Sequence, residues 1–316
     1  MSAGQLNQLS LAKESTWGTP VTPSKSVPVH FTGGIKTDQD LQMISAARAN
    51  LAKNLDSFVG KRVHEGDLEM DFFSDYPGYF VVAALGAVAS ALKGGESVVY
   101  EHTITEQEAK PSYTIEQVVG ENVRRFAGCL ITGFKLSCNT GEPVVLAPSI
   151  KAKSQASATK ITPTYLTNRA FNWADCAFKI GGVVINEVIS FELEYTNNLE
   201  LLHSLSASND PQFQFVKGSE VKGKFECYLN STTLAELNDY LTKTNNALDL
   251  VVTGDAIGVS ANHKIEISIP KVFYTAADTE LGEDYNLVSV EFEGIYDSTT
   301  AKLLSAKLTN LLANYN

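Results

Sequence analysis

The stretch that decides the fold runs from Phe58 to Leu85 and reads FVGKRVHEGDLEMDFFSDYPGYFVVAAL. After Gly66, apolar and polar residues alternate, with Leu68 and Phe72 among the apolar ones. This alternation is typical of a β-strand with one buried face. A polar turn, SDYPG, comes next, and the apolar run YFVVAALG after it predicts a short helix.

The same pattern returns from Phe215 to Leu241, which reads FVKGSEVKGKFECYLNSTTLAELNDYL. Matching residues in the two stretches are all separated by 157 positions. The matched pairs are Phe58 and Phe215, Val59 and Val216, Gly66 and Gly223, Leu68 and Phe225, Glu69 and Glu226, Met70 and Cys227, and Phe72 and Leu229. A constant separation across a whole strand–turn–helix unit indicates an internal duplication. We therefore expect two copies of one β-rich unit.

Length and composition favour a soluble globular protein with two cores. The chain has 316 residues, of which 44% are hydrophobic and 19% charged, and that length is enough for two domains. The longest apolar run, Phe80–Ala91, contains Gly86 and is too short to span a membrane. The N-terminus MSAGQLNQLS has neither the basic head nor the apolar core of a secretory signal. We expect the chain to be made and used in the cytoplasm.

The charge argues against nucleic-acid binding. The net charge is −11 and the pI about 5.0, whereas proteins that bind nucleic acid neutralise phosphates with Lys and Arg. The nearest basic clusters, Arg124–Arg125 and Lys151–Lys153, are too short for such a surface. Two interpretations stay open: the charge serves solubility, or it keeps a surface from sticking to DNA.

No catalytic, cofactor or metal site is predicted. The histidines are scattered without an H-E-x-x-H motif, and neither a G-x-S-x-G elbow nor a glycine-rich phosphate loop is present. The four cysteines form no C-x-x-C pair and are expected to be ordinary thiols in a reducing compartment, with no role assigned to them.

Two residue patterns have alternative interpretations. The pairs Glu192/Glu194 and Glu291/Glu293 each share one strand face, which predicts a solvated surface; a glycosidase dyad is the alternative. Trp17 and Trp173 are predicted to anchor polar segments by packing, and a sugar-stacking platform is the alternative.

Short strands separated by turns predict a mainly β protein with a few short helices, in which a sandwich or barrel unit occurs twice. The predicted divisions are an extended N-terminal segment at 1–26, a first unit at 27–157, a Ser/Thr-rich linker at 158–177, a second unit at 178–298 and an amphipathic C-terminal helix at 299–316.

Two long connections at matching places in the units, 41–57 and 197–214, are predicted to be arms. Long connections in compact units are usually functional or disordered. The candidate contact residues on these arms are Leu41, Met43, Arg48, Asn50, Leu51, Lys53, Leu201, Leu202, His203 and Leu205.

The C-terminal helix is predicted from the helical spacing of Leu304, Leu308 and Leu311. Its apolar side is expected to pack either on its own unit or on a neighbouring subunit.

The segment Lys13–Pro23, KESTWGTPVTP, resembles the opening of bacteriophage tail tube (major tail) proteins. Many of these have a strand ending in Glu, a Thr/Ser–aromatic–Gly–Thr step and then Val-Thr-Pro. The matching positions here are Glu14, Thr16, Trp17, Gly18, Thr19, Val21, Thr22 and Pro23, with Trp17 where Tyr is commoner. Later features are also similar: the strand Gly66–Phe72, the helix Tyr79–Gly86, and the runs Pro111–Gln117 and Arg124–Ser137. The resemblance is best over 11–157.

This resemblance implies a structural protein of the virion tail, assembled in the host cytoplasm, with no cofactor and no membrane partner. Family members fold as β-sandwiches or barrels with a flanking helix and form rings, usually hexameric, whose inner strands line a lumen. Rings stack around a tape-measure protein, end at terminator and tail-tip or baseplate proteins, and later conduct DNA. Two units in one chain favour a trimeric pseudo-hexamer over a hexamer.

Other functions remain alternatives at this point. A different β-rich structural or binding protein is the first: a capsid decoration, a secretion-tube protein or a carbohydrate-binding adhesin module. An enzyme is the second, and the missing catalytic motifs count against it. The predictions leave open the host, the tail type and the residues that face the lumen.

Overall fold

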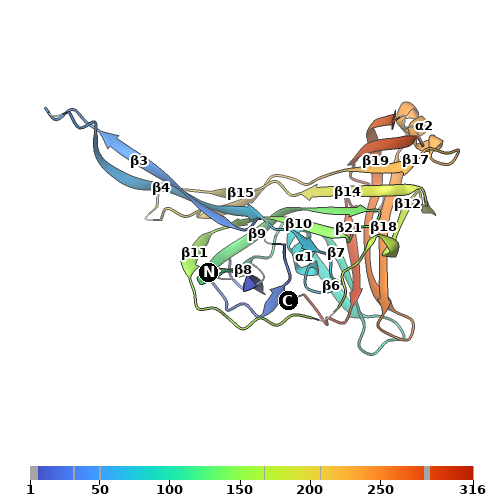
Figure 1. The fold of residues 1–316 in the computed structure, drawn as a ribbon, viewed down its shortest axis with the longest axis horizontal. Helices are drawn as coiled ribbons and strands as arrows, with labels where there is room; N and C mark the ends of the chain where they lie inside the picture. Colours follow the sequence, from blue (N-terminus) through green and yellow to red (C-terminus); the bar gives the residue numbers. More distant parts are fainter. Residues whose placement is uncertain are drawn as a thin grey trace.

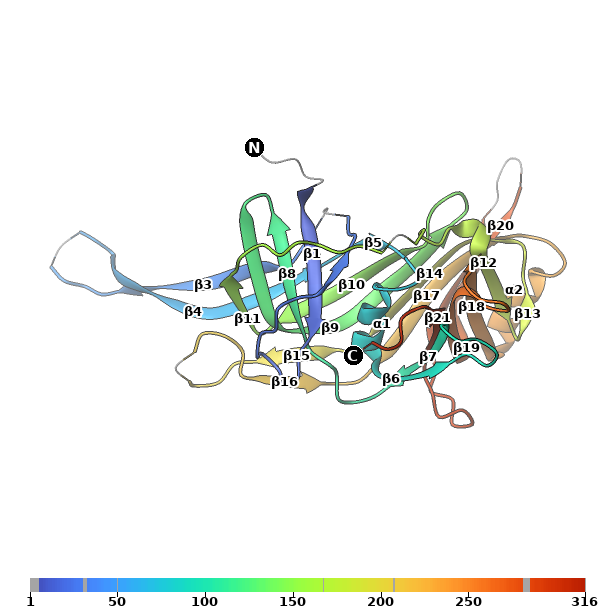
Figure 2. The ribbon, with the colours of Figure 1, turned by 90° about the horizontal axis from the view of Figure 1, so that it is seen from below.

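The computed structural model describes residues 6–30, 33–49, 51–166, 168–206, 208–280 and 285–315, and of Glu280 the backbone alone. Strands dominate the structure (Figures 1 and 2). The α-helices in this part are α1 (Gly78–Leu85) and α2 (Leu234–Thr242), and a 3₁₀ turn, η2, covers Trp173–Asp175. The predicted mainly β fold with a few short helices is confirmed.

Near the N-terminus, strands pair antiparallel in the order β2–β1–β8–β9–β11. Their bounds are β1 Gln8–Lys13, β2 Lys25–Val27, β8 Tyr113–Val119, β9 Asn122–Asn139 and β11 Ser154–Ser157. Leu9 and Leu11 of β1 are buried, so the segment predicted to be merely extended contributes to the core.

The central sheet has the antiparallel order β3–β4–β10–β9–β14–β17–β20–β19. Its bounds are β3 Lys36–Ser45, β4 Asn54–Asp67, β10 Val145–Ala152, β14 Val188–Thr196, β17 Glu220–Tyr228, β19 Asn262–Glu280 and β20 Leu287–Gly294, with the short β5, Met70–Asp71, beside β10. The pairing of β9 with β14, Leu136 opposite Leu193, joins the two halves of the chain in one sheet.

A third layer has the order β6–β7–β21–β19–β18–β12–β13. Its bounds are β6 Gly86–Leu92, β7 Tyr100–Glu106, β12 Cys176–Ile180, β13 Val183–Val184, β18 Asn246–Ala256 and β21 Ser305–Asn310. The long strand β19 belongs to both this layer and the central sheet, because its first half pairs with β21 and its second half with β20.

The predicted C-terminal helix is wrong, because this segment forms the strand β21. Leu304, Ala306 and Leu308 are buried and alternate with the half-buried Ser305 and Lys307. A spacing of four residues fits both periods, since it is about one helical turn and also two steps of a strand. The open edges of β7 and β19 supply the backbone partners that select the strand.

The core lies between these layers. Helix α1 is buried along its whole length and packs on β9 and β7. In the second half, Phe178 of β12 packs against Phe191 of β14 and Phe225 of β17, each at a ring-centre distance of 5.1 Å. Such apolar burial is the main favourable contribution to folding.

The two halves share one order of elements: a long hairpin, a short helix and a second hairpin. Gly66 in β4 and Gly223 in β17, which the repeat aligns, are both tightly packed: a side chain at either would collide with a backbone carbonyl, that of Gly34 or Glu192. The shared order is the one a duplication predicts, and the duplication and its unit boundaries stay predictions.

Candidate assembly surfaces

Two hairpins project from the same side of the molecule, and we call them the first and second arm (Figures 1 and 2). The first arm joins β3 to β4, with Leu41 opposite Val59 and Met43 opposite Ser57. The second joins β15 (Leu199–Leu202) to β16 (Phe213–Val216). The connections 41–57 and 197–214, expected from the sequence to be long loops, therefore begin and end in paired strands, and 46–53 and 203–212 are the loops between them.

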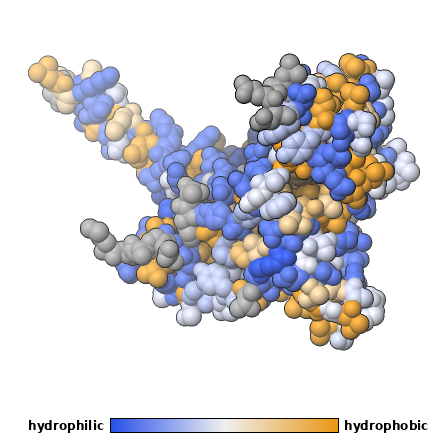
Figure 3. Space-filling view, turned by 45° about the vertical axis from the view of Figure 1, so that its right-hand side comes forward, coloured by the Kyte–Doolittle hydropathy of each residue, from blue (hydrophilic) through white to orange (hydrophobic). Residues whose placement is uncertain are grey.

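The arms expose large apolar side chains. Leu41 and Met43 are both 60% exposed, and Phe58 and Phe215, matched by the repeat, are both 54% exposed. Figure 3 shows hydrophobic residues along the projecting first arm and at its tip. The exposed apolar residues of the arms are Leu41, Met43, Ile44, Leu51, Leu55, Phe58, Leu202, Leu205, Phe213 and Phe215. This many large apolar side chains exposed on two projecting hairpins favours a binding surface.

The other predicted arm residues divide into two groups. Arg48 and Lys53 are exposed on the first arm. Leu201 and His203 of the second arm are partly buried, and Asn50 lies outside the described residues. The sequence did not single out Phe58, Phe213 and Phe215 as contact residues, although the repeat that aligns Phe58 with Phe215 was a usable signal.

Residues of the second arm form hydrogen bonds with the base of the first arm. The Asn209 side-chain amide donates hydrogen bonds to the carbonyls of Val59 and Gly60, each at 2.7 Å. The backbone N–H of Arg62 donates to the Asn209 carbonyl at 2.9 Å, and His203 Nε2 lies 3.0 Å from the Arg62 carbonyl oxygen. The arms are therefore held together at their base.

His64 lies at this junction. Its Nδ1 is 2.9 Å from Thr37 Oγ1 and its Nε2 is 3.4 Å from Asp210 Oδ1. Burial lowers the pKa of His64, although Asp210 opposes this. The neutral imidazole is thus favoured near pH 7. In this form it connects Thr37 of the first arm to Asp210 of the second arm through hydrogen bonds.

Eight charged side chains project from the solvent-facing side of the central sheet, and we call them the charged face. The strands β9, β14, β17 and β20 supply them: Lys135, Glu192, Glu194, Lys222, Lys224, Glu226, Glu291 and Glu293. The opposite side of these strands is buried and apolar, with Phe191, Leu193, Phe225 and Phe292. The predicted solvated faces at Glu192/Glu194 and Glu291/Glu293 are thus confirmed.

Charges of opposite sign alternate across the strands of the charged face. Lys222 stands between Glu194 and Glu293, and in the next row Lys224 stands between Glu192 and Glu291. Opposite charges directly across an antiparallel pair are mildly stabilising. The lysines on β17 were not singled out from the sequence, because the strand register decides which carboxylates they face.

Ion pairs within the charged face are exposed and strongly solvated. Lys135 Nζ lies 2.7 Å from Glu192 Oε1, and Lys224 Nζ lies 2.7 Å from Glu226 Oε1. The pKa of Lys222 is raised, first by a hydrogen bond to Glu220 and then by the charges of Glu220, Glu293 and Glu194. With five carboxylates and three lysines, the charged face carries both signs of charge and has a net negative charge.

The N-terminal motif forms a buried hydrogen-bond centre at Glu14. Glu14 Oε1 accepts from Thr114 Oγ1 and the Gly128 N–H, both at 2.8 Å, and Oε2 accepts from Ser112 Oγ at 2.8 Å and the Gly18 N–H at 2.9 Å. Gly18 and Gly128 have φ of +77° and +65°, which suits glycine.

Trp17 is a packing anchor, as predicted. Its Nε1 donates to the Gly128 carbonyl at 3.1 Å, and the Lys153 ammonium lies 4.3 Å from its ring centre. Trp173 is half-exposed beside a cavity that Cys138 and Cys176 also line. No contact tests the predicted anchoring role of Trp173.

Of the two predicted packing partners for Leu304 and Leu308, the structure shows their own chain. Both side chains are fully buried within their own chain, because β21 places them between the sheets. Leu311 follows the strand and remains 46% exposed.

Within the described ranges, no group of three or more His, Cys, Asp or Glu side chains is arranged to hold a metal ion. The helices of this part are likewise all too short or too polar to cross a membrane.

The chain was compared with known protein families. The sequence model of the phage tail tube protein family matches residues 4–294 of the chain. A search of curated proteins with this chain found no match. The matched range includes both arms, the Glu14 motif and all of the charged face.

Proposed function

Because this chain belongs to the phage tail tube protein family, whose members are structural components of the virion tail, we propose that it is the major tail tube subunit. In this proposal it forms rings that stack around a tape-measure protein and later conduct DNA. The family assembles into a tube; the ring geometry and the roles of the surfaces described above are our proposal.

The observation that carries the proposal is the pair of arms. Two apolar hairpins leave the body on one side, from equivalent places in the two halves of the chain. Exposed apolar side chains favour burial against another protein, and the unpaired backbone groups of a free sheet edge favour pairing with another strand. We assign each arm to a contact with the next ring, so that each chain makes two equivalent contacts along the tube axis.

Three chains would then close a ring with pseudo-sixfold symmetry. The repeated order of hairpin, helix and hairpin supports six similar units per ring. Lateral contacts would use the sheet edges: β6 pairs with β7 on one side and, among the described residues, with no strand on the other. A closed ring with one repeated heterologous contact leaves no such edge free.

We place the charged face on the lumen. It is continuous across the β9–β14 junction and so extends over both halves of the chain. Its excess of carboxylates repels the phosphate backbone, and its lysines are already paired with carboxylates. Duplex DNA would therefore pass without being held.

Stacking through arms on one side makes the two ends of a tube different. At one end the arms have no ring to contact, and at the other the surface that receives them is open. We propose that tail-tip or baseplate and terminator proteins cover these two ends, with the tape-measure protein inside.

Electron microscopy of the concentrated protein tests the proposal. Negative-stain class averages should show rings of six similar lobes, and native mass spectrometry should give three chains per ring. A protein that stays monomeric at high concentration, or rings that contain six chains, would contradict the corresponding part.

A further inference from the structure

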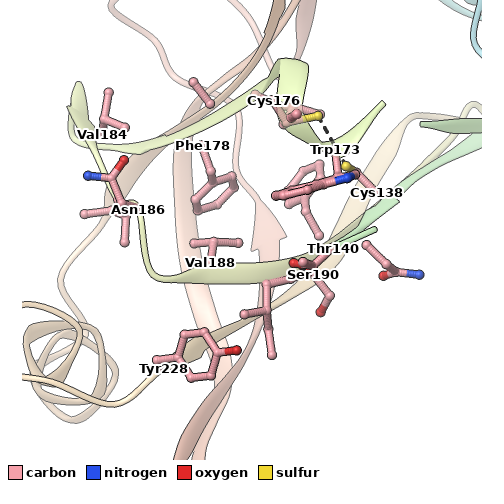
Figure 4. A pocket seen from close by; sticks show the side chains of 17 residues that line it. Cys138, Thr140, Trp173, Cys176, Phe178, Val184, Asn186, Val188, Ser190 and Tyr228 are labelled. Atoms are coloured by element: carbon pink, nitrogen blue, oxygen red, sulfur yellow. Dashed lines mark hydrogen bonds between the residues drawn. The ribbon is translucent and has the colours of Figure 1, made fainter. Parts of the chain in front are cut away.

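The pair Cys138 and Cys176 has no part in the assembly surfaces. Cys138 is the penultimate residue of β9, and Cys176 is the first residue of β12, directly after η2. Their Sγ atoms lie 3.2 Å apart although the residues are 38 positions apart in sequence (Figure 4). The pair connects the central sheet to the third layer at the start of the second half.

The other cysteines, Cys129 and Cys227, are buried apart from any second sulfur. The Cys129 thiol donates to the Phe126 carbonyl and the Cys227 thiol to the Val288 carbonyl. Burial raises the pKa of Cys129 well above its usual value and that of Cys227 to about 12. Both are therefore held as unreactive thiols, since the thiolate is the nucleophile.

Cys138 differs from these two. A hydrogen bond from the Cys176 thiol lowers the pKa of Cys138, against the opposing effects of burial and of Glu142 and Asp175. The same interaction raises the pKa of Cys176. The contact between the two sulfurs therefore favours the thiolate on Cys138 over that on Cys176.

The two cysteines line an open cavity. A cavity of about 370 Å³ borders them, and its lining includes Trp173, Thr140 and Phe178. Figure 4 shows the Trp173 side chain beside the two sulfurs. Trp173 and Thr140 are exposed to solvent, so the cavity is open from outside.

We propose that Cys138 and Cys176 form an oxidisable dithiol, reduced while the chain is in the host cell and converted to a disulfide bond after the virion is released. The cytosol keeps thiols reduced, whereas disulfides persist outside cells. A disulfide requires the sulfurs to approach from 3.2 Å to about 2.05 Å.

The oxidant is a small-molecule disulfide, RSSR. The Cys138 thiolate attacks one of its sulfurs, which releases one RS⁻ and leaves a mixed disulfide on Cys138. Cys176 then loses its proton to water and attacks the Cys138 sulfur, which releases the second RS⁻. Two electrons pass from the protein to RSSR, and two RSH form for each protein disulfide.

The bond would close a loop from residue 138 to residue 176 that contains β10, β11 and η2. Closing such a loop removes freedom from the unfolded chain. The oxidised protein should therefore unfold at a temperature roughly 5 °C higher than the reduced one.

Intact-mass spectrometry tests the proposal. The folded full-length protein is treated with oxidised glutathione, quenched with acid and measured. The expected product is 2 Da lighter, has two of its four cysteines still reactive after denaturation, and contains a 138–176 linked peptide.

Variants separate this pair from the other thiols. Cys138→Ser should remain unoxidised, Cys176→Ser should accumulate a glutathione adduct on Cys138, and Cys227→Ala should oxidise like the wild type. Four reactive cysteines in the treated wild type, or a persistent adduct on it, would overturn the proposal. The readout is a covalent change in the chain, so it is independent of whether the protein forms three-chain rings.

Discussion

Glu14 Oε1 accepts a hydrogen bond of 2.8 Å from the backbone N–H of Gly128, 114 residues further along the chain. The carboxylate is buried and uses both oxygens to hold β1, the strand β8 and the bulged part of β9 together. A carboxylate suits this place because every neighbouring group donates.

We therefore expect Glu14→Gln to destabilise the protein by about 3 kcal/mol, because the amide nitrogen would face donors and leave them unpaired. Chemical denaturation of the unassembled protein measures this. Glu108→Gln, at an exposed position, is the control and should change the free energy of unfolding by less than about 0.5 kcal/mol. Equal stability of the Glu14 variant and the wild type would show that the hydrogen-bond centre is unimportant.

The arms should be needed for stacking and dispensable for folding. The double variant Leu41→Ser with Met43→Ser removes two exposed apolar side chains from the first arm. We expect the protein concentration needed for tube formation to rise at least about tenfold, because each side chain contributes about 1.5–3 kcal/mol when buried. Sedimentation and microscopy over a concentration series give this threshold.

The matched control replaces two exposed apolar residues on the body, Leu241→Ser with Val259→Ser. Tube formation by this control should match the wild type, and both double variants should keep wild-type thermal unfolding. If the arm variant forms tubes at the same protein concentration as the wild type, the first arm does not contribute to the stacking contact.

Reversing charge on the charged face should make the tube retain DNA. In Glu192→Lys with Glu194→Lys, the side chains still project into solvent, but the balance of the face becomes positive. We expect tubes of this variant to bind short duplex DNA at least about tenfold more tightly at low salt, with the gain falling steeply as salt is added. Co-sedimentation of labelled DNA with tubes measures it.

A variant with the same net charge elsewhere, Glu108→Lys with Glu121→Lys, serves as the control, since both residues are exposed away from the charged face. Equal DNA binding by the two variants would mean that the net charge of the subunit alone determines DNA binding, and it would contradict the placement of the charged face on the lumen.

Asp75 should make stability depend on pH. Burial raises its pKa to about 6, above the usual value near 3.9. The folded state thus favours the protonated form. Asp75 imposes no penalty below the unfolded pKa of about 3.9, the penalty grows as the pH rises from about 4 to about 6, and it stays at its full size above that pH. Its full size is about 3 kcal/mol for a shift of about two units.

Asp75→Asn removes the charge and keeps a side-chain oxygen for the Asn168 amide, which donates to Asp75 Oδ2 in the structure. This variant should be more stable than the wild type at pH 7.5, and the difference should vanish near pH 4. Urea unfolding at several pH values gives the difference, and a difference independent of pH would contradict the assignment.

Sequence patterns predicted the elements with one buried face. The helix before Gly86 and the solvated face at Glu192 and Glu194 follow from apolar periodicity. The alternation at Leu68–Phe72 predicted the buried side chains of Leu68, Met70 and Phe72, but the strand there is only the short β5. The arms gave no such pattern, because a hairpin exposed on both faces has no buried side to impose alternation. The arms were predicted from the matching positions of two long connections in the chain, and the structure shows that each arm is a hairpin of paired strands joined by a loop.

Other features depended on distant partners. Leu304 and Leu308 fit a helix and a strand equally well, and only the edges of β7 and β19 decide between them. The contact of Cys138 with Cys176 and the row that places Lys222 between two glutamates both require the strand register. A single sequence without aligned relatives does not contain that register.

The position of β21 has a consequence for biosynthesis. His102 on β7 and its hydrogen-bond partner Asn310, at the end of β21, are 208 residues apart, so a nascent chain presents the edge of β7 long before its neighbour leaves the ribosome. Contacts this distant in sequence slow folding and leave the intermediate prone to wrong associations. We therefore expect a subunit to complete its fold only after β21 has been translated, which would disfavour association of incomplete chains on polysomes.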